Sequence, residues 1–317
     1  LVLAILVPIT ALLMRWYTTR QLVIGGLVIS LAGAILAALS PSFVVLLLGR
    51  LVQAVGTGLI LPVMTTVLLI IFPIHRRGAV MGLMGLVITL APALGPTLSG
   101  VIISALDWPY IFWFSAIFYV LLIIYAMTKI ENVSEITKPK IDYPSILFST
   151  IGFGGLIFAL STLAEKSITV PIVWGPLLAG IIALLLFGVR QATMEQPMVN
   201  LRVFKYPMFT LGTLMMFLGI LVILSTAILL PLYLKSALLF TAIMAGLILL
   251  PGNAVNFVMS PIVGALFDKW GPRVFIITGS VIALIGNIMF ITVISATTPT
   301  WQIIVAFMIL FLGLTIG

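Results

Sequence analysis

One arginine stands inside a long apolar run, and it is the residue of this sequence best placed to do chemistry. Arg50 is the eighth residue of the run 43–72, which at about 1.5 Å per residue puts it roughly 12 Å along a helix. If that run crosses a bilayer, the charge costs about 2.5–3.5 kcal/mol, so Arg50 must find polar partners, as functional membrane charges do. Gln53 follows one turn later and can share its face. We predict a buried polar switch at these two residues; an arginine that snorkels outward as an anchor is the alternative.

A second candidate lies in a short charged connection. Residues 264–273 read Gly-Ala-Leu-Phe-Asp-Lys-Trp-Gly-Pro-Arg. Gly264 would let neighbouring helices approach closely, and the Asp268 carboxylate could meet a helix N-terminus or an arginine of another helix. We predict a latch formed by Gly264, Asp268, Lys269 and Arg273. The alternative is a charged turn that only fixes the orientation of the chain in the membrane.

A third candidate is the run 78–104, which carries small residues at four-residue spacing. Ala91, Gly95 and Ser99 would form one small-residue stripe for close helix contact. Pro92 and Pro96 each remove a backbone donor and are expected to kink the helix. The candidate residues of this run are Gly82, Ala91, Gly95, Pro96, Ser99 and Gly100. Ordinary packing of small residues would produce the same stripe.

Three asparagines in later apolar runs could bind a substrate. Asn253 and Asn256 are three residues apart on one helix face, and Asn287 lies in the following run. They could line a substrate cavity. Equally, they could form interhelical hydrogen bonds, which are worth about 0.6 kcal/mol each within a membrane.

The elements that must position these residues are membrane helices. Of the 317 residues, 63% are hydrophobic and 7% charged, with a mean hydropathy of +1.38, whereas soluble domains are about 25% charged. This composition excludes a soluble enzyme or a nucleic-acid-binding module and makes the lipid bilayer the main partner. The chain has no cysteine and one histidine, His75, so disulfides and a His-based metal site are excluded.

The apolar runs number eleven, and the connections between them alternate in charge. Twelve of the fifteen Lys and Arg residues fall in one alternating set of connections, two in the other, and Arg50 lies inside a run. Because basic loops stay in the cytoplasm, the charged connections are predicted to be cytoplasmic. The predicted helices cover residues 1–14, 21–39, 43–72, 78–104, 108–128, 143–163, 171–189, 208–234, 240–266, 273–295 and 301–317.

Three of these patterns resemble motifs of the major facilitator superfamily. The segment 264–273 is similar to its loop signature G-x-L-x-D-[RK]-x-G-x-[RK], and Arg50–Gly56 resembles R-x-x-Q-G-x-G with Ala54 as a departure. The run 78–104 resembles the antiporter motif G-x8-G-x3-G-P-x2-G-G, with Ala91 and Ser99 in place of two glycines. Residues 108–115 look like a segment of its 14-span drug:proton antiporters. The resemblance implies an all-α membrane protein in which Arg50 takes part in proton coupling.

An internal repeat gives the expected domain organisation. Residues 8–20 align without gaps on 261–273, although Ala11 and Arg15 replace the glycine and aspartate of the loop signature. Parallel repeats in transporters form two pseudo-symmetric bundles with the substrate site between them. The copies are eight runs apart, two more than in 12-span members, so we expect two extra spans between the bundles. The expected organisation is an N-terminal bundle over 1–128, two inserted central spans with cytoplasmic loops over 129–207, and a C-terminal bundle over 208–317. On this count the chain covers spans 2–12, truncated at both ends, with the first and the last two spans missing.

The function expected from the resemblance is a proton-coupled exporter of drugs or amphiphilic small molecules in a bacterial cell membrane. We expect a monomeric secondary transporter rather than an enzyme, with no cofactor, no metal and no nucleic-acid partner. The absence of a phosphate-cradling loop argues against ATP-driven transport. None of the seven acids lies in the middle of a run, which favours neutral or amphiphilic substrates over strongly cationic ones. An importer or uniporter of a small metabolite with the same fold is the alternative.

Overall fold

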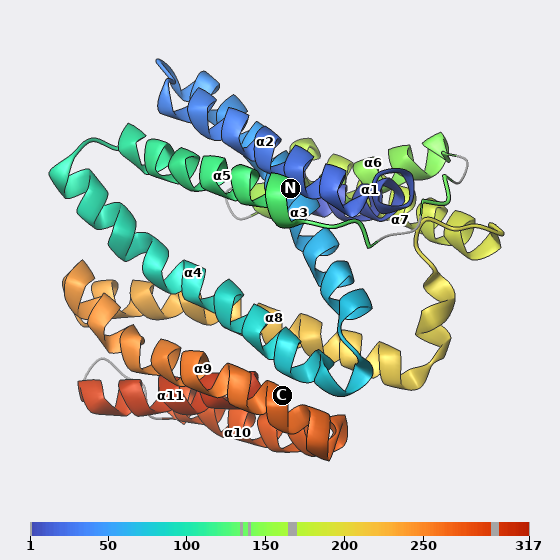
Figure 1. Cartoon of the computed structure of the whole chain (residues 1–317). Helices are drawn as coiled ribbons and strands as arrows, with labels where there is room; N and C mark the ends of the chain where they lie inside the picture. Colours follow the sequence, from blue (N-terminus) through green and yellow to red (C-terminus); the bar gives the residue numbers. More distant parts are fainter. Residues whose placement is uncertain (1, 134–135, 139–140, 164–169, 293–297, 317) are drawn as a thin grey trace. The chain divides into compact units, whose positions relative to one another are not determined.

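The computed structural model describes residues 2–133, 136–138, 141–163, 170–292 and 298–316, and leaves the side chains of 89–94, 96–97 and 242–243 undescribed. Within these residues the regular structure consists of eleven α-helices and two short 3₁₀ helices (Figure 1). Each predicted run contains one α-helix, and the ends differ by at most four residues. The predicted all-α fold class is confirmed. Eight of these helices, α2, α3 and α5–α10, are long and apolar enough to cross a membrane.

The chain divides into two compact units. Unit 1 comprises Leu1–Ile71 and Val101–Tyr206, and unit 2 comprises Phe72–Gly100 and Pro207–Gly317. The helices of unit 1 are α1 (Val2–Trp16), α2 (Thr19–Ala38), α3 (Phe43–Ile71), α5 (Pro109–Lys129), α6 (Tyr143–Leu163), α7 (Pro171–Thr193) and η2 (Leu201–Lys205). Those of unit 2 are η1 (Ile74–Arg76), most of α4 (Arg77–Ala105), α8 (Pro207–Ser236), α9 (Ala242–Trp270), α10 (Pro272–Thr292) and α11 (Thr300–Ile316).

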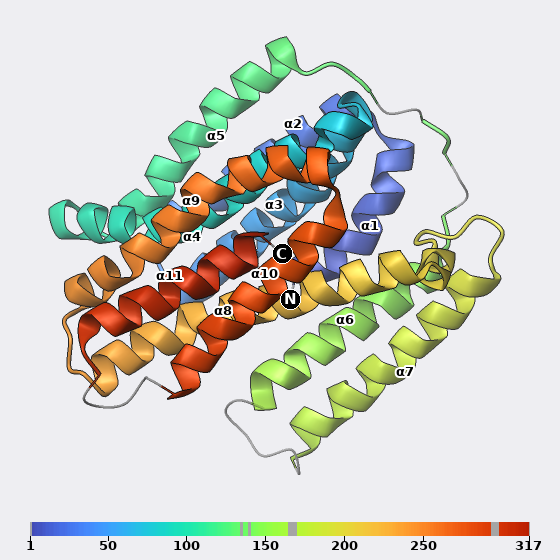
Figure 2. The same cartoon turned by 90° about the horizontal axis from the view of Figure 1, so that it is seen from below.

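In unit 1, α2 packs along α3 and α5. In the same unit α6 packs along α7 as a helical hairpin (Figure 2). Glycines allow the α2–α3 approach: a Cβ on Gly33 would lie 2.7 Å from the Gly49 carbonyl oxygen, and one on Gly49 would lie 2.7 Å from the Ala37 nitrogen. Small residues are needed at such contacts because helices in lipid associate through close backbone packing. The α2–α3 pair is therefore held at short range.

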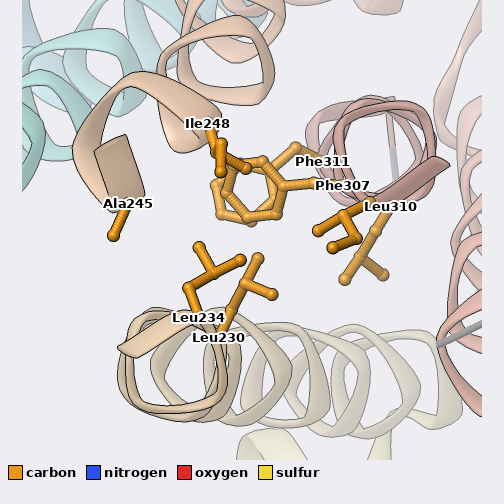
Figure 3. Close-up of a cluster of buried hydrophobic side chains, with 8 residues drawn as sticks. Leu230, Leu234, Ala245, Ile248, Phe307, Leu310 and Phe311 are labelled. Atoms are coloured by element: carbon orange, nitrogen blue, oxygen red, sulfur yellow. The ribbon is translucent and has the colours of Figure 1, made fainter. Parts of the chain in front are cut away.

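Unit 2 has a buried apolar core where α11 packs against α8 and α9. Leu230 and Leu234 of α8 point toward Phe307 and Phe311 of α11, with Ile248 of α9 beside them (Figure 3). Gly252 of α9 makes room for this cluster, since a Cβ there would overlap the Phe307 ring. α10 packs along α11 in the same unit.

Local sequence sets several helix ends. Thr18 begins α2 through a capping box, accepting from the Gln21 nitrogen at 3.2 Å while the Gln21 side chain accepts from the Thr18 nitrogen at 3.1 Å. Gly271 ends α9 with a φ of +76°, a left-handed conformation that side chains with a Cβ disfavour. Pro272 then begins α10, so Gly271, the second glycine of the loop signature, forms the turn between α9 and α10.

Candidate functional site

Arg50 and Gln53 form the polar contact that the sequence predicted. The Arg50 Nη1 donates to Gln53 Oε1 at 2.7 Å, and the Gln53 Nε2 donates to the Tyr119 hydroxyl of α5 at 3.4 Å. The Arg50 guanidinium carbon also lies 5.8 Å from the centre of the Phe112 ring, a cation–π arrangement. α3 and α5 together therefore hold this cluster, which we call the Arg50 cluster: Arg50, Gln53, Phe112 and Tyr119.

The two ends of the Arg50 cluster differ in exposure. Gln53 is buried, with 8% of its surface exposed, because Gly33 of α2 lies directly against the Gln53 backbone. Arg50 is exposed at its position on α3, so of the pair predicted to be buried only Gln53 is. The part of the chain that the structure describes offers the Arg50 guanidinium no carboxylate. The Gln53 amide therefore orients the Arg50 guanidinium, whose other N–H donors make no hydrogen bond to the described residues and could bind an anion.

Asp268 caps the first turn of α4. Its Oδ1 accepts from the Gly78 nitrogen at 2.8 Å, and its Oδ2 accepts from the Ala79 nitrogen at 2.9 Å. The first N–H groups of a helix have no partner within the helix and carry a partial positive charge, so they favour a carboxylate. Of the two partners considered for this acid, the structure places a helix N-terminus next to it.

Backbone contact between α4 and α9 brings the carboxylate to this position. A Cβ on Gly78 would lie 2.6 Å from the Gly264 carbonyl oxygen, and one on Gly82 would lie 2.6 Å from the Ser260 carbonyl oxygen. The Ser260 hydroxyl also donates to the Gly82 carbonyl oxygen at 2.7 Å. Gly264 is therefore a residue of close helix approach, as expected, and its partners are the glycines of α4. We call this set the α4–α9 contact: Gly78, Ala79, Gly82, Ser260, Gly264 and Asp268.

The other latch and motif residues lie away from that contact. Lys269 and Arg273 are exposed and pair with no acid among the residues described. At Gly95 and Gly100 an added Cβ would meet no described atom within 4 Å, and Ser99 is half-buried. The side chains of Ala91 and Pro96 lie outside the described residues.

The three asparagines take up different positions. Asn256 is buried, and its Oδ1 accepts from the Thr315 hydroxyl of α11 at 3.0 Å, so it joins α9 to α11. Asn253 is half-buried on α9. Asn287 lines a cavity between α8, α10 and α11.

The first copy of the loop signature is tied to the segment after α5. The Arg15 carbonyl oxygen accepts from the Thr137 and Lys138 nitrogens, both at 3.1 Å. The Arg20 nitrogen donates to Asn132 Oδ1 at 3.2 Å, and its guanidinium donates to the Met127 carbonyl oxygen near the C-terminal end of α5. A cation at a helix C-terminus is favourable, so this turn uses bases where the second copy uses an acid.

An ion pair that the sequence did not suggest fixes the base of the α6–α7 hairpin. Arg190 Nε and Nη2 donate to the two oxygens of Asp142, each at 2.7 Å, and Ser145 donates to the same carboxylate. The Arg190 hydrogen bond, followed by that of Ser145, lowers the pKa of Asp142 from 3.8 to about 2 against the opposing effect of burial. Gln191 continues the network, donating to Ser145 at 2.7 Å and accepting from the Val199 nitrogen at 3.0 Å.

The sequence identified several of the candidate residues but not the residues that contact them. Gly78 and Gly82 are four residues apart, a small-residue spacing that could have identified the α4 side of the contact. Tyr119 and Phe112 carry no such signal, because a ring in an apolar run is usually a packing residue. No group of three or more His, Asp or Glu side chains that could hold a metal occurs among the residues searched.

Comparison with known proteins places the chain in a family. The model of the Major Facilitator Superfamily matches residues 1–317. The chain is 49% identical over 315 residues to the lincomycin resistance protein LmrB of Listeria innocua, an alignment of 99% of this chain and 67% of that protein. It is 50% identical over 287 residues to LmrB of Bacillus subtilis, covering 90% of this chain and 60% of the relative.

A further relative in Bacillus subtilis, the MFS-type transporter YcnB, is 41% identical over 309 residues, covering 98% of this chain and 65% of its own length. The chain thus spans about two thirds of the length of these relatives. The match along the whole chain confirms the family that the motifs indicated, and the apolar helices agree with it. The chain belongs to the major facilitator superfamily and is a multi-pass membrane protein and secondary transporter, not an enzyme.

Proposed function

We propose that the protein exports drugs or other amphiphilic small molecules by alternating access, in exchange for protons. The observation that carries this proposal is the 49–50% identity to two proteins named for lincomycin resistance. A transporter that confers resistance to a compound must lower the concentration of that compound in the cell, which favours export over import. The proposed location is the bacterial cell membrane, with the charged connections in the cytoplasm.

The Arg50 cluster is the proposed proton-coupling element. Gln53 holds one guanidinium nitrogen at 2.7 Å, and the rest of the group is exposed. A fixed cation in a medium of low dielectric keeps a nearby carboxylate ionised, and moving the carboxylate away lets it take up a proton. An acid brought to Arg50 in one state of the transport cycle and withdrawn in the other would therefore bind and release a proton in step with the conformational change.

The α4–α9 contact is the proposed cytoplasmic latch. Asp268 links the end of α9 to the start of α4 through two hydrogen bonds that involve a charge, each stronger than a neutral one. Because these bonds depend on the position of the α4 N-terminus, a movement of α4 relative to α9 would break both together. In the proposed domain organisation α4 belongs to the bundle 1–128 and α9 to the bundle 208–317, with an inserted pair of spans between.

A transport assay with the full chain in proteoliposomes tests this function. With an imposed pH gradient, radiolabelled lincomycin should accumulate on the side from which protons flow, and an uncoupler should remove that accumulation. Equilibration of lincomycin across the membrane without accumulation, unaffected by the pH gradient or the uncoupler, would indicate a uniporter. Movement of drug and proton in the same direction would indicate an importer.

A further inference from the structure

A cavity of about 290 Å³ lies within unit 2, between α8, α10 and α11. Its walls are mainly apolar and include Leu229, Phe290 and Leu310. Four polar side chains also face it, and none of the residues that line it is charged. These polar residues are Ser225, Thr226, Tyr233 and Asn287.

Two of these polar side chains have hydroxyls that no described residue contacts through a hydrogen bond. In the same unit, Thr213 and Thr278 donate to the carbonyl oxygens four residues earlier, at 2.9 and 2.8 Å, which is how helices in lipid satisfy such groups. The hydroxyls of Ser225 and Thr226 make no hydrogen bond with any residue of the described ranges. Both residues are half-buried where they line the cavity, so each hydroxyl can donate to and accept from a bound molecule.

The carboxamide of Asn287 uses its nitrogen, but not its oxygen, in hydrogen bonds to the described residues. Its Nδ2 donates to the Ala283 carbonyl oxygen at 3.0 Å. Its Oδ1 accepts no hydrogen bond from the residues that the structure describes. A ligand that carries an O–H or N–H donor could therefore bind this oxygen without displacing an existing bond.

The cavity is built on tightly packed helices. Gly286, the neighbour of Asn287, packs against α11 so closely that a Cβ there would lie 2.6 Å from the Leu310 Cα. Leu230 and Leu310 line the cavity and also belong to the buried cluster of Figure 3. The α10–α11 side of the cavity is therefore closely packed, and on the α8 side Leu230 is anchored in the buried cluster.

We propose that this cavity binds a neutral amphiphile that carries hydroxyl or N–H groups, or the amphiphilic part of a larger molecule of that kind. The inference rests on the proposed function and names a substrate class and a site for it. The volume falls near the lower end of ligand pockets, about 300–1,000 Å³, which typically combine apolar walls with a few polar groups. The lack of a charged lining residue disfavours a permanent cation, whose charge would remain unpaired.

Equilibrium binding of radiolabelled lincomycin to the full chain in nanodiscs tests the site. The measurement is made at alkaline pH, where the tertiary amine of lincomycin is uncharged. Thr226→Val removes the hydroxyl at nearly constant volume, and Asn287→Leu removes the amide. Each should lower the affinity about three- to tenfold, the effect of one lost hydrogen bond, whereas Thr226→Ser keeps the hydroxyl and should bind like the wild type.

Thr213→Val is the matched control, because its hydroxyl lies on the same helix but is bonded to the α8 backbone. A wild-type affinity for this variant, together with weakened Thr226→Val and Asn287→Leu, supports the site. The proposal is overturned if wild-type protein binds no lincomycin, if both cavity variants bind normally, or if Thr213→Val loses as much affinity. Lincomycin transport that survives in the cavity variants rejects the site alone; site-dependent binding without any transport rejects the exporter function alone.

Discussion

The Asp268 carboxylate sits on the N-terminus of α4, with its Oδ1 2.8 Å from the Gly78 nitrogen. The pairing is possible because Gly78 has no side chain: a Cβ there would lie 2.6 Å from the Gly264 carbonyl oxygen. The acid of the loop signature and a glycine 190 residues earlier thus form one contact. Charge and close packing act at the same point: Asp268→Asn removes the charge and leaves the packing, whereas a side chain at Gly78 would disturb both.

Asp268→Asn should slow transport while leaving substrate binding near the wild-type level. The amide keeps one acceptor oxygen but loses the charge that favours the helix N-terminus, a loss of about 1 kcal/mol that corresponds to a roughly fivefold effect. Efflux rates and equilibrium binding, measured on the same preparation, separate an effect on transport from an effect on substrate binding. Asp107→Asn, which changes an acid in the connection between α4 and α5, outside this contact, is the control. Unchanged efflux kinetics in Asp268→Asn would count against the latch.

Gly78→Ala should destabilise the α4–α9 contact through steric overlap. Inserting a methyl group into a filled contact costs about 1–3 kcal/mol, and the closest atoms are backbone or the Asp268 carboxylate. Thermal unfolding in detergent measures the loss. Gly219→Ala on α8 is the matched control, because its Cβ would meet no described atom within 4 Å and alanine favours a helix by about 1 kcal/mol. Equal melting temperatures for the two variants would show that the close approach is absent.

Arg50→Ala should abolish drug resistance without preventing membrane insertion. The substitution removes the cation that Gln53 orients, so the proposed proton-coupling element is lost and proton-driven transport should be lost with it. Arg50→Lys keeps the charge but loses the planar fork, so it should give an intermediate rate. Lys205→Ala, the loss of an exposed cation in η2, serves as control. Normal resistance in cells that carry Arg50→Ala at wild-type levels would remove the Arg50 cluster from the mechanism.

The Asp142–Arg190 pair should make stability fall in acid. The pKa of Asp142 is about 2 in the folded chain and 3.8 ordinarily. The unfolded state therefore binds the proton more readily than the folded state. The stabilisation is fully present above pH 3.8 and is lost as the pH falls toward 2. The effect is about 1 kcal/mol, reduced by solvent screening because Arg190 is 41% exposed. The free energy of unfolding, measured across this pH range, should fall with pH in the wild type. Asp142→Asn should remove this pH dependence, and Asp107→Asn should retain it.

The predicted orientation can be tested with introduced cysteines, because the 317 residues contain none. Lys235→Cys lies at the end of α8 and Lys269→Cys near the end of α9. The positive-inside rule places the first outside the cell and the second in the cytoplasm. A membrane-impermeant maleimide added to intact cells should label Lys235→Cys alone, and label Lys269→Cys only after permeabilisation; the reverse pattern would invert the topology.

The sequence alone determined the helices and the kind of protein. Runs of apolar residues long enough to cross a bilayer, bounded by Pro, Gly or charged residues, fix each element locally, since the backbone must satisfy its hydrogen bonds within each helix in lipid. For this reason the predicted run 143–163 coincides with α6 from end to end. Arg50 and Gln53 were also local, because one helical turn brings them together.

Tertiary structure alone decided the partners between helices. The loop signature left Asp268 a choice between a helix N-terminus and an arginine, and the packing of Gly264 on α4 selected the former. The three asparagines read alike in sequence, yet Asn256 bonds Thr315 whereas Asn287 faces a cavity. A side chain's periodicity gives its face on its own helix, but its neighbour depends on which backbones can approach, and that is set by small residues far away in the chain.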